Sequence, residues 1–107
     1  MTRQRILPAM LLAASLLVPA SAMAHAAICS CFDNGDNTVT CEGGFSDGSS
    51  AAGVRVFVRD ASDTTIARGA MNDDSEFTFE KPAGAYTVLF DAGPGHQIQI
   101  QGSNIVQ

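Results

Sequence analysis

The chain has 107 residues with 6 basic and 11 acidic side chains, which gives a formal net charge of −5. This acidity excludes the basic groove that a nucleic-acid-binding domain requires, so we expect no nucleic-acid partner. The HExxH, C-x-x-C and glycine-rich phosphate-loop patterns of common enzyme classes are also missing from the sequence. We therefore predict that the protein is not an enzyme.

Residues 1–24 have the pattern of a secretory signal peptide. "MTRQR" supplies two positive charges, "ILPAMLLAASLLVPA" supplies an apolar core, and small-x-small cleavage sites end at Ala22 and Ala24. The apolar run is too short for a membrane span, so we expect no direct membrane insertion after cleavage. The mature domain would comprise residues 25–107 and would be periplasmic or secreted. It would carry four basic against eleven acidic residues, a net charge of −7.

The three cysteines lie near the start of this domain. A strand is expected over residues 27–32, and on it Cys29 and Cys31 would face the same side. A hairpin that reverses around Gly35 would place Cys29 opposite Cys41, and a loop centred one residue later would place Cys31 there instead. We expect one disulfide that involves Cys41, since export favours oxidation. The cysteines would then be a staple or soft auxiliary metal ligands.

The rest of the chain alternates apolar and polar residues with a period of two, which is the pattern of β-strands. Glycine, proline, aspartate, asparagine and serine separate these segments, as expected for turns. Six or seven short strands predict an all-β fold, a small antiparallel Greek-key β-sandwich. The further predicted strands are 38–42, 54–59, 64–71, 76–80, 85–90 and 97–101. The predicted core residues are Phe77, Phe79, Tyr86, Val88 and Phe90, facing Val54, Val56 and Val58.

The run "GVRVFVRDASDTTIARGAMNDDSEFTFEKPAGAYTVLFDAG", from Gly53 to Gly93, resembles the carboxypeptidase regulatory-like (transthyretin-like) β-sandwich family. The shared features are a glycine before a V-x-V-x-V strand, an Asp-rich turn, a short F-x-F strand, "P-x-G" and an aromatic-led strand. One departure is Ser75, which stands where a glycine usually precedes the first phenylalanine. The resemblance implies a sandwich that serves as a structural or adhesive module without a catalytic set.

A second, shorter resemblance is to small periplasmic accessory proteins of nickel and cobalt uptake systems. In those proteins a histidine just after the leader precedes a similar sandwich, which ends near a glycine-rich turn with a histidine. The matching parts here are "AHA" at 24–26 and "DAGPGH" at 91–96. This resemblance implies a metal ion as ligand and a membrane metal transporter as a protein partner.

Signal cleavage decides what His25 can do. A cut after Ala24 makes it the N-terminal residue, whose α-amine and imidazole can chelate one metal ion. A cut after Ala22 puts it in third place, where amine, amides and imidazole can wrap Cu(II) or Ni(II) in a square plane. A cut after Ala26 would discard it. The other histidine, His96, lies in an exposed Gly-Pro-Gly turn.

These features lead to two hypotheses. The first is an exported sandwich that binds a divalent transition metal, nickel or cobalt first and copper second, in metal uptake or handling. Its ligands would be His25 and His96, with Cys29, Cys31 and Cys41 as staple or auxiliary ligands. The alternative is a structural or interaction module that docks to a protein partner. The distance between the two histidines discriminates between the hypotheses.

Overall fold

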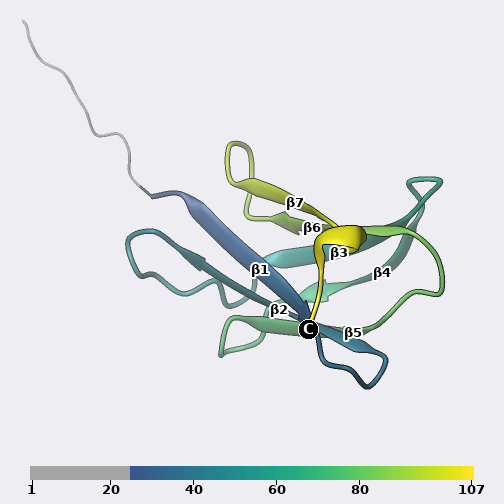
Figure 1. Ribbon diagram of the computed structural model, residues 1–107. Coiled ribbons are helices and arrows are strands. Elements are labelled where there is room, and N and C mark those ends of the chain that lie inside the picture. The colour runs from purple at the N-terminus through teal and green to yellow at the C-terminus, as the bar shows by residue number, and fades with distance from the viewer. Residues whose placement is uncertain (1–24) are drawn as a thin grey trace, which may run out of the picture.

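The computed structural model describes residues 25–107, so the predicted signal peptide lies outside the described part of the chain. Seven antiparallel strands form two sheets, with strand orders β1-β2-β5 and β4-β3-β6-β7 (Figure 1). This arrangement confirms the predicted all-β sandwich. The strands are β1 (Ala27–Asp33), β2 (Thr38–Phe45), β3 (Arg55–Asp60), β4 (Thr65–Ala70), β5 (Glu76–Glu80), β6 (Tyr86–Asp91) and β7 (Gln97–Gln101), followed by the 3-10 turn η2 (Gly102–Asn104). Within this part of the chain, no helix is long and apolar enough to cross a bilayer.

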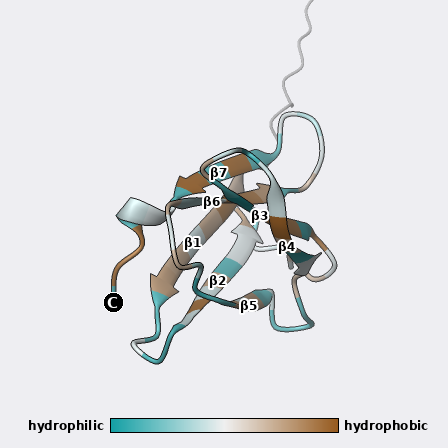
Figure 2. Ribbon diagram, turned by 90° about the vertical axis from the view of Figure 1, so that its right-hand side faces the viewer, coloured by the Kyte–Doolittle hydropathy of each residue, from teal (hydrophilic) through white to brown (hydrophobic). Residues whose placement is uncertain are grey.

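The core lies between the sheets and follows from the period-two alternation of the central strands. In β3, Val56 and Val58 are fully buried and pair with Phe90 and Val88 of β6. Several of the turns that join the strands are hydrophilic, and parts of the strands are hydrophobic (Figure 2). The buried hydrophobic residues are Val39, Cys41, Ala51, Val56, Val58, Met71, Phe79, Tyr86, Val88, Phe90 and Ile105.

Two predicted core residues are only half-buried. Val54 lies just before β3, on the same side as Val56 and Val58, and packs half-buried against the margin of the core. Phe77 of β5 reaches towards β4 of the other sheet, where it covers Gly69. A Cβ atom on Gly69 would lie 2.4 Å from the Phe77 ring, so the glycine leaves the space that this aromatic ring fills. Phe77 therefore closes one side of the sandwich and is not part of its centre.

Ser75, the departure from the family pattern, adopts the left-handed backbone conformation that favours glycine, with φ of 62°. The side chain has a role that glycine would lack, because its hydroxyl accepts a hydrogen bond from the Ala51 backbone N–H at 2.9 Å. Ala51 is fully buried in the loop between β2 and β3. The serine therefore ties that loop to the turn before β5.

Gly43 of β2 lies under the ring of Phe90. A Cβ atom at position 43 would fall 2.5 Å from Phe90 Cε2 and 3.2 Å from both Ala51 Cβ and Met71 Cε. We therefore expect Gly43→Ala to lower the free energy of unfolding by about 1–3 kcal/mol through overpacking, measured by urea denaturation.

The neighbouring Gly44→Ala variant is the control for that substitution. The nearest atom to a Cβ at Gly44 is the Ser49 carbonyl oxygen at 4.0 Å. If both variants lose the same stability, the contact with Phe90 is not the cause. A double variant that also carries Phe90→Leu should lose less than the sum of the two single losses, because the smaller side chain relieves the clash.

Candidate metal site at one end of the sandwich

Three segments that are distant in the sequence meet at one end of the sandwich. They are the start of β1, the loop that follows β2 and the turn between β6 and β7 (Figure 1). The first two are joined by a pair of hydrogen bonds, in which Ser46 N donates to the Ala26 carbonyl at 2.9 Å and Ala26 N donates to Ser46 Oγ at 2.8 Å. Each of the three segments contributes one side chain that can bind a metal ion.

His25 is held against the aromatic side of the core. Its ring meets the ring of Phe45 edge to face at 5.2 Å, and Phe45 in turn lies 6.4 Å from the ring of Phe90. The side chain of His25 remains 40% exposed. The aromatic core residues therefore hold one side of the imidazole in place, and its other side is open to solvent.

Asp47 is a candidate metal ligand at the same end of the sandwich, and the sequence analysis did not identify it. Its Oδ2 lies 3.5 Å from His25 Nδ1. Its Oδ1 accepts hydrogen bonds from Ser49 N at 2.9 Å and from Ser49 Oγ at 2.6 Å. These two bonds, and then the nearby His25, lower the pKa of the Asp47 carboxyl group. The carboxylate is ionised at neutral pH, and one of its oxygens is left for His25 or a cation.

His96 closes the turn between β6 and β7. Its backbone N–H donates to the Gly93 carbonyl at 2.9 Å, and Gly93 and Gly95 both have positive φ, 108° and 79°. The tight turn brings His96 Nδ1 to 3.2 Å from the Pro94 carbonyl oxygen. A proton on Nδ1 can be donated to that carbonyl, and Nε2 then presents its lone pair. Backbone carbonyls commonly orient metal-binding histidines in this way.

The two histidines lie side by side although 71 positions separate them in the sequence. Their ring centroids are 5.2 Å apart with the planes tilted by 39°. Two donor atoms that each lie about 2.1 Å from one ion are roughly 3.0–3.4 Å apart. The separation of 3.5 Å between His25 Nδ1 and Asp47 Oδ2 is close to this value. The end of the sandwich thus gathers two imidazoles and a carboxylate, with His25 next to both His96 and Asp47.

Ser46 lies in "GFSDG" at 44–48, which has the G-x-S-x-G spacing of a nucleophile elbow. An elbow of that type requires a strand followed by a helix. Here the serine follows β2 and leads into a turn and then β3. Its hydroxyl accepts the Ala26 amide proton. The structure therefore gives Ser46 a part in joining β1 to the loop.

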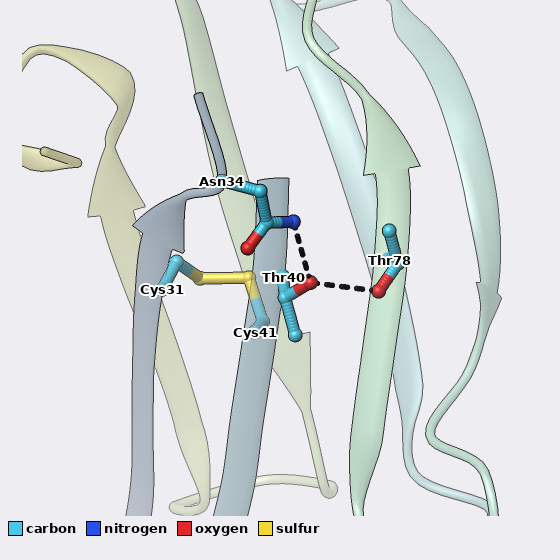
Figure 3. Close-up of a disulfide and its surroundings, with 5 residues drawn as sticks. All are labelled: Cys31, Asn34, Thr40, Cys41 and Thr78. Carbon is cyan, nitrogen blue, oxygen red and sulfur yellow. Dashed lines mark hydrogen bonds between the residues drawn. A yellow bond between two sulfur atoms is a disulfide. The ribbon is translucent and has the colours of Figure 1, made fainter. Parts of the chain in front are cut away.

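The cysteines form a second group, the sulfur cluster, which consists of Cys29, Cys31 and Cys41. Cys31 pairs with Cys41 across β1 and β2, and the two form a disulfide (Figure 3). This confirms a disulfide that involves Cys41 and selects the later loop centre over one at Gly35. Cys29 is free, lies opposite Gly43, and burial raises the pKa of its thiol to about 11.

All three sulfur atoms lie within 4.8 Å of one another. The cluster is nevertheless distinct from the histidine pair, because Cys29 follows His25 by four residues. At about 3.3 Å per residue of strand, the two positions are roughly 13 Å apart along the chain. In the oxidised protein Cys31 and Cys41 act as the staple.

No family model matches the chain, and no curated protein or solved structure is significantly similar to it.

Proposed function

We propose that the exported chain begins at His25 and binds a divalent transition metal ion at this end of the sandwich, nickel or cobalt first and copper second. The observation that carries the proposal is the 5.2 Å separation of the His25 and His96 rings. The ligands would be the α-amine and imidazole of His25, the imidazole of His96 and the carboxylate of Asp47. The protein would serve metal uptake or handling, with a membrane metal transporter as partner.

The donor set supports this choice of metal. Amine and imidazole nitrogens with one carboxylate oxygen are borderline ligands that suit nickel, cobalt and copper, whereas thiolates would favour Cu(I) or zinc. The disulfide removes two of the three sulfurs from competition. A mature net charge of −7 would also attract cations to the domain.

The exposure of the site supports transfer of the metal. The side chains of His25 and Asp47 are 40% and 49% exposed, so a partner could approach the ion directly. A disulfide in a small domain fits an oxidising compartment. We accordingly place the mature protein in the periplasm or outside the cell.

The test is calorimetric titration with Ni(II) of protein that begins at His25. One additional alanine before His25 keeps the fold but moves the amine out of chelate reach, so affinity should fall by at least about tenfold, or about 1.4 kcal/mol. His96→Ala should cause a comparable loss. Affinity should also decrease as pH drops through the range in which imidazoles protonate, because amine and imidazole must both lose protons to bind.

Asp63→Asn is the matched control for Asp47→Asn. Asp63 lies in the turn between β3 and β4, at the opposite end of the four-stranded sheet, and its side chain is 81% exposed. Asp47→Asn should weaken nickel binding, and Asp63→Asn should leave it unchanged. Unaltered affinity in the alanine-extended protein would remove His25 as the anchor and refute the proposal.

The second candidate function is a docking module of the carboxypeptidase regulatory-like type. It is favoured by Ile28 and Phe32, which lie on the outward face of the edge strand β1 with exposed fractions of 51% and 36%. Absence of nickel binding in every form of the protein would leave this candidate in front.

A further inference from the structure

The sulfur cluster contributes no ligand to the proposed nickel site. Cys41 is fully buried, and Cys29 and Cys31 are half-buried against the same core. The three side chains face inward from two paired strands, since positions 29 and 31 alternate with the outward Ile28, Ser30 and Phe32. Three sulfurs on one inner surface are the ligands that a single sulfur-binding ion or atom with three bonds would need.

The spacing of the sulfurs fits such a centre after reduction. Two sulfurs that each lie about 2.3 Å from a shared ion are about 3–4 Å apart. All three sulfurs here lie within 4.8 Å of one another, so small side-chain rotations would suffice once the Cys31–Cys41 bond opens. Cys29 supplies the third donor without any change in strand register.

We propose that reduction of the Cys31–Cys41 disulfide opens a second site, in which the three thiols of the sulfur cluster capture trivalent arsenic offered as arsenite. The site is independent of the histidine pair.

The chemistry of capture balances in two steps. A dithiol reductant gives two electrons and two protons to the Cys31–Cys41 bond, which yields two thiols, and the reductant becomes a disulfide. Neutral arsenous acid, As(OH)3, then exchanges its three hydroxyl groups for the three cysteine sulfurs. Three As–O bonds and three S–H bonds are replaced by three As–S bonds, and three water molecules leave with the thiol protons.

Charge selects arsenic over the other thiophilic ions. Three thiolates around Cu(I) carry a net charge of −2, and three around Zn(II) carry −1. Burying an uncompensated charge in apolar surroundings is costly. The product with As(III) is neutral, and the cluster lies against the hydrophobic core, with Cys41 fully buried. Burial of the cluster therefore favours As(III), whose complex is neutral, over Cu(I) and Zn(II), whose complexes are charged.

The pairing of β1 with β2 does not depend on the disulfide alone. Asn34 Nδ2 donates to Thr40 Oγ1 at 2.9 Å, and the Thr40 and Thr78 hydroxyls are 2.8 Å apart, which links the hairpin to β5 (Figure 3). Asp33 N also donates to the Val106 carbonyl at 2.9 Å. These bonds would keep the three thiols facing one another after reduction.

The test uses the mature protein reduced with a water-soluble phosphine, which takes an oxygen atom from water and leaves no competing thiol. Addition of arsenite should give one arsenic per chain by intact mass and should protect all three thiols from alkylation. It should also raise the melting temperature of the reduced protein, because a ligand that prefers the folded state stabilises it. If reduction alone unfolds the chain, arsenite should restore the circular dichroism of the folded protein.

Cys29→Ser is the decisive variant, since it keeps the disulfide pair but removes the third donor. After reduction it should bind arsenite at least about tenfold more weakly than the unsubstituted protein. Equal affinities of the two proteins for arsenite would overturn the proposal. A melting temperature that does not rise on addition of arsenite would also overturn it, because binding would then need only three thiols on a flexible chain and not the folded site. Protection of the three thiols by Cu(I) but not by arsenite would overturn the argument from charge. His96→Ala should bind arsenite normally, which separates this site from the nickel site.

Discussion

Phe90→Ala is expected to lower the free energy of unfolding by about 3–5 kcal/mol, because it leaves a cavity at the centre of the core. Phe90 heads the fully buried side chains by residue volume. Its ring covers Gly43 of the opposite sheet and lies 6.4 Å from the ring of Phe45. Small domains are marginally stable, with total stabilities of about 5–15 kcal/mol. The expected loss is therefore a large part of the total stability of such a domain.

Urea denaturation followed by circular dichroism would measure this effect. Phe32→Ala is the matched control, since it removes the same atoms from an outward position on the edge strand β1 that is 36% exposed. The control should lose much less stability than Phe90→Ala. Similar losses would mean that the inner and outer faces of the sheets have been assigned wrongly.

Cys41→Ala is expected to lower the free energy of unfolding by about 2–3 kcal/mol when measured without reductant. The disulfide closes a loop with a sequence separation of 10 residues, and its loss restores conformational freedom to the unfolded chain. Alanine is preferable to serine because position 41 is fully buried, where an unpaired hydroxyl would add its own cost. The remaining cysteines are both on β1 and cannot restore the link to β2.

Cys29→Ser keeps the disulfide and is the control for that measurement. It should lose less stability than Cys41→Ala, and its melting temperature should still fall on addition of a reductant. Three titratable thiols in air-oxidised native protein would contradict the disulfide assignment.

The sequence determined the sandwich because strand alternation is a local property. Val56 and Val58 alternate with charged or outward residues, and burying one face of such a strand fixes which side chains enter the core. The same reasoning located Phe79, Tyr86, Val88 and Phe90 correctly. It also put Phe77 on the inner face, opposite Cys41, but it did not show that Phe77 would be only half-buried over the space left by Gly69 on the other sheet.

The sequence alone did not determine the register of the first hairpin, in which β1 pairs with β2. Gly35 and Asn37 both adopt positive φ, 80° and 74°, so more than one position in the loop tolerates the left-handed conformation. Loops centred one residue apart place either Cys29 or Cys31 opposite Cys41. The tertiary structure selects Cys31.

The sequence by itself identified His25 and His96 as candidate ligands, because their neighbours predict a cleavage site and an exposed glycine-rich turn. Only the tertiary structure decided that the two rings lie 5.2 Å apart and that Asp47 lies beside His25. The histidines belong to different sheets, and local alternation fixes which residues face the core without fixing which turns of the two sheets meet at one end. The way in which the two sheets stack, with Phe45 and Phe90 packed between them, decides which turns lie together. Stacking in turn depends on contacts between residues that are far apart in the chain.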